Sequence, residues 1–152
     1  MAEVVDQELV AELARDLVGA IAPEELPLFG AMSKAWFADP ARVQTQQGDD
    51  VLAFGVAEAA ALLSPVLLAA ATHALNYAGE EVGKNLATVS VAWLREQLRH
   101  LFHRQDSGVS LDAQQIAKVR AITLETARKF RIPKEKATEI ADAVTARFAP
   151  KS

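Results

Sequence analysis

The chain has 152 residues, a length that suits one domain. Hydrophobic residues make up 51% of it and charged residues 24%, so it can bury a real core, and disorder over most of its length is excluded. The absence of cysteine excludes disulfides, thiolate zinc sites and cysteine nucleophiles. Thirty alanines favour helix over strand.

Charge is unevenly distributed along the chain. The net charge is −4, but residues 1–76 carry 11 acids and 3 bases (−8), whereas residues 77–152 carry 9 acids and 13 bases (+4). Such a split can orient a partner or draw the two halves together. The first twenty residues lack the basic start and apolar run of a secretory signal. We therefore expect a cytoplasmic protein, with a peripheral membrane location as the alternative.

The first 40 residues predict two helices. Asp6 can cap the first, whose apolar residues recur at spacings of three and four: Leu9, Val10, Leu13, Leu17 and Ile21. Pro23 suits the first turn of a second helix, and Asp39 with Pro40 predicts its end, because a residue before proline avoids the helical region. Its apolar side comprises Leu28, Met32, Trp36 and Phe37. Residues 42–50 are polar and predict a loop.

Residues 51–78 form an unusually apolar stretch that carries one charged side chain, Glu58. The stretch is long enough to span a membrane, which takes about 20 apolar residues. Its many alanines, its acidic flanks and Pro65 weaken that interpretation. We favour the buried centre of a helical bundle, in which Ser64 and Pro65 could start a second helix.

The chain between residues 65 and 103 allows two interpretations. Gly79 and Gly83 suggest a break, but the apolar phase continues through both glycines, so one long helix from Pro65 to His103 is equally compatible. Residues 104–110 predict a turn in which Ser110 caps the next helix. Apolar stripes on either side of Pro133 then predict a helical hairpin over residues 111–149.

These elements define the predicted fold. No stretch alternates with period two for long enough to form a strand, so the fold class is all-α. We expect a compact helical bundle of five to seven helices with a C-terminal helical hairpin. It would form a single domain over residues 1–152, with possible sub-units at 1–104 and 110–149.

Residues that could carry catalysis or bind a metal do not form a convincing site. Glu96, His100 and His103 share one helix face, but nearby arginines oppose a divalent cation. Glu58 and His73 lie in apolar segments, where a structural role is more common than acid–base catalysis. No nucleophile elbow or phosphate-binding loop is present. We expect no enzymatic activity, no cofactor and no metal.

Basic residues in the second half raise the question of anion binding. Arg95, Arg99 and Arg104 form the candidate anion-binding group. A second group surrounds the hairpin turn, comprising Lys118, Arg120, Arg128, Lys129, Arg131, Lys134 and Lys136. Interleaved glutamates and the acidic protein as a whole make a solvated helix surface the simpler interpretation.

The favoured function is a non-enzymatic interaction or self-assembly module that contacts a protein partner or further copies of itself. The candidate interface residues are apolar or aromatic: Trp36, Leu62, Leu63, Leu67, Leu68, Trp93 and Phe102. The first alternative is a membrane-associated or membrane-active protein that inserts residues 51–78. The second is nucleic-acid binding through the basic half, which we consider unlikely.

Overall fold

The computed structural model describes residues 7–39, 63–84, 90–103 and 111–149, and over these ranges the regular structure is helical, with no strand. The all-α fold, a bundle of five to seven helices, is confirmed. The described helices are α1 (Gln7–Ile21), a short 3₁₀ turn η1 (Pro23–Glu25), α2 (Leu26–Ala38), α4 (Ser64–Lys84), α5 (Val91–Phe102), α6 (Ala113–Lys129) and α7 (Lys134–Phe148). The predicted cap Asp6, the predicted loop at 42–50 and the carboxylate Glu58 lie outside the described residues.

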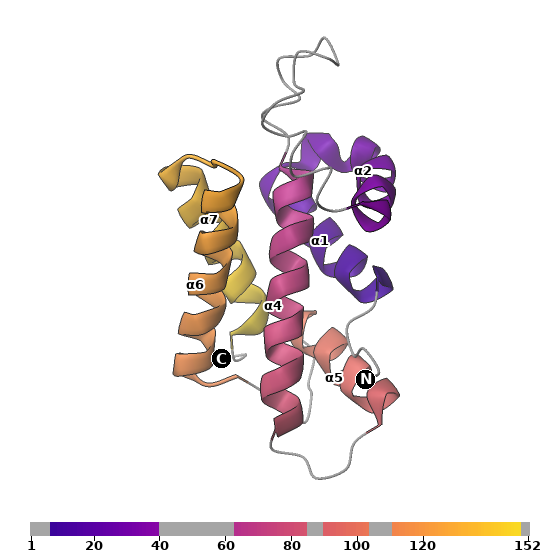
Figure 1. Cartoon of the computed structure of the whole chain (residues 1–152), viewed down its shortest axis with the longest axis vertical. Helices are drawn as coiled ribbons and strands as arrows, with labels where there is room; N and C mark the ends of the chain where they lie inside the picture. Colours follow the sequence, from indigo (N-terminus) through magenta and orange to yellow (C-terminus); the bar gives the residue numbers. More distant parts are fainter. Residues whose placement is uncertain (1–6, 40–62, 85–89, 104–110, 150–152) are drawn as a thin grey trace.

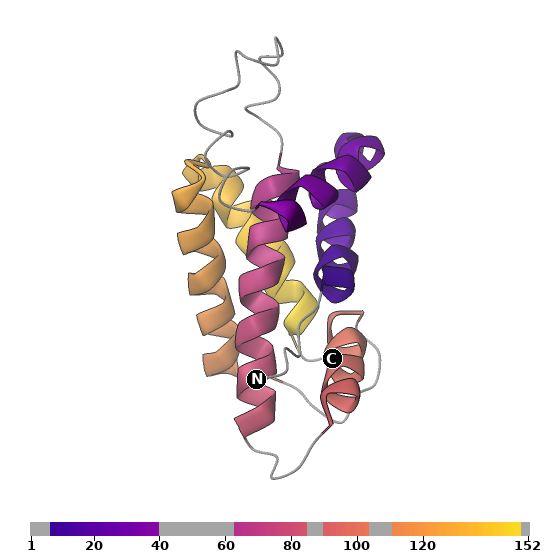
Figure 2. The ribbon, with the colours of Figure 1, turned by 45° about the vertical axis from the view of Figure 1, so that its right-hand side comes forward.

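Helix α4 is the central element of the bundle. It runs between α1 and α2 on one side and the antiparallel pair α6 and α7 on the other (Figures 1 and 2). Eight successive residues, Ser64–Ala71, are buried, so the first two turns are covered from every direction. This explains why the sequence is apolar on all sides there, because a helix with that pattern belongs in a core or a membrane.

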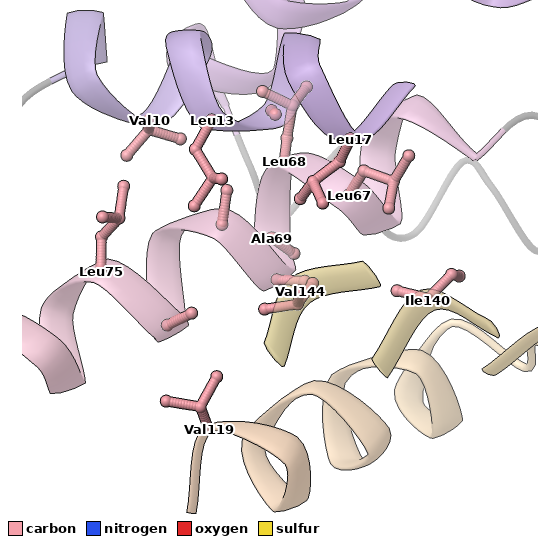
Figure 3. Close-up of a cluster of buried hydrophobic side chains, with 14 of the residues drawn as sticks. Val10, Leu13, Leu17, Leu67, Leu68, Ala69, Leu75, Val119, Ile140 and Val144 are labelled. Atoms are coloured by element: carbon pink, nitrogen blue, oxygen red, sulfur yellow. The ribbon is translucent and has the colours of Figure 1, made fainter. Parts of the chain in front are cut away.

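Figure 3 shows the part of the core in which α4 meets α1, α6 and α7. Leu67, Leu68 and Leu75 of α4 are fully buried. They lie among side chains of α1, α6 and α7, which include Val10, Leu13, Leu17, Val119, Ile140 and Val144. The many alanines of α4 take little space, so neighbouring helices can approach its axis closely and the leucines fill the remaining gaps.

The start of α4 is fixed by a residue from another element, Glu25. Its carboxylate is only 4% exposed and accepts hydrogen bonds from the backbone N–H of Leu63 and of Ser64 and from the Ser64 hydroxyl, at 2.8–2.9 Å. The first N–H groups of a helix have no partner inside the helix and point toward its positive end. Glu25 therefore acts as an N-cap supplied from 38 residues earlier in the chain.

Proline completes this helix start. Pro65 is the second residue of α4 and has no N–H, so one of the donors that would need a partner does not exist. The expectation that Ser64 and Pro65 begin a helix is confirmed. The same arrangement explains how a charged side chain can be buried here, since its oxygens accept several hydrogen bonds at once.

Helix α4 continues through Gly79 and Gly83 and ends at Lys84, so a break at Gly79 is wrong. A single helix reaching His103 is also wrong, because Ser90 has an extended backbone and caps α5 by accepting a hydrogen bond from the Trp93 N–H at 3.0 Å. Gly83 faces α5, where a Cβ would lie 3.7 Å from Leu94.

The C-terminal hairpin is confirmed, with α6 and α7 packed side by side (Figure 1). The prediction that Ser110 caps α6 is wrong, because the cap is Asp112. The Asp112 carboxylate accepts a hydrogen bond from the Gln115 N–H, and the Gln115 side-chain oxygen accepts one from the Asp112 N–H. This capping box satisfies two donors at once. Arg131 takes the left-handed conformation after α6 (φ 59°), and the Ile132 N–H returns to the Ala127 carbonyl at 3.0 Å.

We expect Glu25→Ala to lower the free energy of unfolding by about 3 kcal/mol, because two buried N–H groups lose a charged acceptor. Ser64→Ala removes one hydrogen bond and keeps the other contacts, so it should cost about 1 kcal/mol. Urea denaturation followed by circular dichroism measures both. A loss below 0.5 kcal/mol for Glu25→Ala would show that this cap does not hold α4 in place.

A second expectation concerns His73, which lies on α4 near Lys129 of α6. Partial burial lowers the pKa of His73 below its ordinary value of 6.5, and the charge of Lys129 lowers it further. Since the folded state favours the neutral ring, the stability that His73 contributes is complete above pH 6.5 and is lost as the pH falls toward the lowered pKa. NMR titration of the ring, assigned with His73→Gln, should give a midpoint below 6.5. A midpoint at or above 6.5 would contradict this.

Candidate functional site

Most of the apolar residues predicted to form an interface are covered by their own chain. Leu67 and Leu68 have no exposed surface, and Leu63 is 8% exposed. Trp36 is 7% exposed, and its ring lies 6.4 Å from that of Phe130, between centroids. Leu62 lies outside the described residues. These four side chains therefore offer almost no outer surface.

Trp93 is the predicted interface residue that does reach the surface, with 38% of its area exposed. Helix α5 turns Leu94, Leu98 and Leu101 toward the bundle and leaves Trp93 on its outer side. The neighbouring exposed positions are Ser90, Ala92 and Glu96. Trp93 is thus an aromatic side chain among small and polar neighbours. Phe102 is the last residue of α5, and its side chain is outside what the structure describes.

A larger apolar surface lies on α2, the helix on the outside of the bundle beside α1 and the upper end of α4 (Figures 1 and 2). Its thirteen residues include one charge, Lys34. The buried side comprises Phe29 and Trp36, but the outward positions are also apolar or small: Pro27, Leu28, Gly30, Ala31, Ala35 and Ala38. Leu28 is 51% exposed, the highest value among the large apolar side chains in the described ranges.

These outward residues form one face, which we call the α2 outer face. Leu28, Ala31 and Ala35 follow each other at three and four residues, the spacing that places side chains on one side of a helix. Glu24 of η1 extends this face at its beginning, because the backbone of Glu25 and Leu26 is right-handed helical and joins η1 to α2. Lys34 lies three residues after Ala31 and four before Ala38. The α2 outer face therefore begins at an acid, Glu24, and carries one base, Lys34, between Ala31 and Ala35.

Among the candidate anion-binding arginines, Arg99 pairs with an acid of another helix. The Arg99 guanidinium donates to both carboxylate oxygens of Glu12 on α1, with Nε–O distances of 3.1 and 3.0 Å, and Nη2 lies 2.9 Å from Oε2. The hydrogen bond to Glu12 raises the pKa of Arg99. Arg95 is partly exposed, and Arg104 lies outside the described residues. Binding an anion at Arg99 would require displacing Glu12.

The histidines on α5 point to different carboxylates. His100 Nε2 lies 3.0 Å from Glu96 Oε1, whereas His103 lies 3.5 Å from both Glu12 and Asp16 of α1. Arg99 and Arg147 reach the same two α1 carboxylates. No group of three histidine, aspartate or glutamate side chains in the described part of the chain is arranged to hold a metal ion. This cluster joins α5 and α7 to α1 by ion pairs.

On the hairpin, three of the predicted basic residues pair with acids that interrupt the positive surface. Arg120 contacts Asp142 at 2.6 Å, Arg128 contacts Glu125 at 2.7 Å, and Lys136 contacts Glu139 at 2.9 Å. Each pair lies on or between α6 and α7. This arrangement matches a solvated helix surface better than a continuous track for a phosphate backbone.

Comparisons of the chain with protein-family models, with curated proteins and with solved structures found no match. Across the described helices, none combines the length and the apolar character needed to cross a bilayer.

Sequence reasoning missed two of the residues that define these surfaces. Leu28 was assigned to the inner side of its helix, whereas the structure turns it outward. The available signal was composition, since a helix of thirteen residues with one charge is apolar on both sides. Glu25 is the second residue that the sequence did not single out. Its contact with Leu63 spans 38 residues, and no local pattern reveals such a contact.

We expect Arg99→Ala to lower the free energy of unfolding by about 1 kcal/mol, because the Glu12 carboxylate loses its bidentate partner in a partly buried place. Arg128→Ala is the matched control: its pair with Glu125 is exposed and lies within one helix, so no measurable change is expected. Thermal unfolding at low and high salt measures both. Equal effects of the two substitutions would contradict a special role for Arg99 and Glu12.

Proposed function

We propose that this protein is a non-enzymatic interaction module that self-associates through the α2 outer face. The observation that carries the proposal is Leu28, a large apolar side chain that is half exposed on an outer helix whose other exposed positions are mostly small residues. A contiguous exposed apolar surface on a folded domain is typical of a protein–protein or membrane contact. The small residues around Leu28 would allow another helix to approach closely.

The α2 outer face supports this function better than the surface around Trp93. Tryptophan is common among residues that dominate binding energy. On α5, however, its exposed neighbours include Ser90 and Glu96, and hydrogen bonds or ion pairs engage both within the same helix. On α2 the other exposed positions are alanine, glycine, proline and a single lysine, Lys34. An interface centre formed there would leave fewer polar groups without partners.

Two other functions remain as alternatives. Membrane association through residues 51–78 is less favoured because the described part of that segment, from Leu63 onward, supplies the core of the bundle. Nucleic-acid binding is less favoured because acids pair with Arg120, Arg128 and Lys136 on the hairpin.

We expect the protein to form a dimer or larger assembly at micromolar concentration, and Leu28→Lys to shift it to monomer. Leu28 is exposed, so the substitution should change the free energy of unfolding by less than about 0.5 kcal/mol. Sedimentation velocity over a concentration series measures the association, and circular dichroism verifies the fold.

Trp93→Ala is the matched comparison, since Trp93 is the other exposed large apolar residue in the described ranges. We expect it to keep both the association and the helicity. If Trp93→Ala loses association while Leu28→Lys still associates, the interface lies on α5 and not on α2. A wild-type protein that stays monomeric at high micromolar concentration would contradict self-association.

A further inference from the structure

The α2 outer face carries a charge pattern that is complementary to itself in one orientation. Glu24 lies at its beginning and Lys34 follows ten residues later, which is about 15 Å along a helix. Both side chains are exposed, and neither forms a hydrogen bond or an ion pair within the described residues. Between them lie Leu28 and Ala31. Opposite charges therefore flank the apolar segment that contains Leu28 and Ala31, and Ala35 and Ala38 continue the surface beyond Lys34.

Resting on the function proposed above, we infer that the occupant of the α2 outer face is the α2 helix of a second copy of this chain, packed antiparallel about a two-fold axis. In that arrangement each Lys34 approaches Glu24 of the partner subunit, and both ends form opposite-charge pairs. A parallel arrangement would place Lys34 against the partner's Lys34 and Glu24 against the partner's Glu24. Like charges at both ends oppose that arrangement.

The geometry also locates the axis. Positions 24 and 34 are equidistant from position 29, so the two-fold axis passes beside the turn that contains Leu28 and Gly30. A contact of this type is isologous, since the same surface serves both copies. Gly30 leaves room for the approach, because a Cβ built there meets no atom of another element within 4 Å. The two helix dipoles also run in opposite directions.

A lipid surface fits the α2 outer face less well than a second copy does. Helices that lie in a membrane interface expose large apolar side chains beside lysine and arginine. This surface exposes alanine and glycine around a single leucine, with one acid and one base. The acid would face anionic headgroups, and the small residues would gain little from insertion.

Charge reversal provides the first test, with the dissociation constant of the dimer measured by sedimentation in low-salt buffer. Glu24→Lys alone and Lys34→Glu alone each turn two attractive pairs into two repulsive ones, and each should weaken the dimer about tenfold. The double variant that carries both changes in one chain restores attraction only when the helices are antiparallel. We expect its dissociation constant to return to within about twofold of the wild-type value.

The outcomes separate this inference from the proposed function. Dimerisation that depends on Leu28 but is not restored in the double variant would overturn the antiparallel pairing and leave the proposed function in place. A monomeric wild-type protein would overturn both. A third outcome would favour a membrane as the occupant. In that case the wild-type protein is monomeric in solution but is recovered with anionic phosphatidylserine vesicles, and Leu28→Lys abolishes that recovery.

Cysteine cross-linking provides an independent test, because the chain has no cysteine of its own. Ala31 lies two residues from position 29, beside which the two-fold axis passes, and Ala38 lies nine residues from it. Along the helix axis, the two copies of Ala31 are therefore offset by about 6 Å and the two copies of Ala38 by about 27 Å. With a short bifunctional thiol reagent, which spans an offset too long for a disulfide, Ala31→Cys should form a covalent dimer and Ala38→Cys should not. Equally efficient cross-linking at both positions would indicate parallel helices and overturn the inference.

Gly30→Ala and Gly19→Ala make a matched pair of glycine substitutions. Each glycine lies in an exposed position of a helix, and an added Cβ meets nothing within 4 Å at either one. Both changes should therefore preserve or raise the melting temperature of the monomer. Only Gly30→Ala should weaken the dimer, since Gly30 borders the proposed contact and Gly19 lies on α1. Equal dimer affinity in the two variants would place the contact away from Gly30.

Discussion

The buried carboxylate of Glu25 determines the arrangement of the first half of the bundle. It satisfies the N–H groups at the start of α4 and simultaneously fixes the point at which η1 passes into α2. A charge can remain buried only where donors surround it, so this position has little freedom. The start of the central helix and the start of an outer helix are therefore held together by one side chain.

The position of α2 follows from this constraint. One end of α2 is held at Glu25, and near its other end Trp36 packs against Phe130 after α6. Both anchors use the inner side of α2, so Leu28 and the small residues beside it face away from the bundle. The apolar outer face is thus a consequence of how the helix is attached. A helix that is apolar on both sides can bury only one side against its own chain.

The sequence predicted the features that depend on local pattern. Periodicity located α1, α6 and α7, and Pro65 marked the start of α4 to within one residue. It failed where a contact between distant segments decides the outcome. Glu25 and Leu63 are 38 residues apart, and Trp36, which holds the inner side of α2, packs against Phe130 at the end of α6, much later in the chain. Leu67 and Leu68 were expected at an interface because an apolar stretch by itself does not reveal whether its own chain covers it.

Nuclear Overhauser contacts between subunits test the central claim most directly. In a dimer assembled from equal amounts of isotope-labelled and unlabelled chains, filtered spectra report only pairs of protons on different copies. We expect contacts from the Leu28 methyl groups to α2 of the partner subunit, and none from the Trp93 ring. A dimeric sample that shows intersubunit contacts only from α5, or none from Leu28, would contradict the claim that the α2 outer face joins two copies.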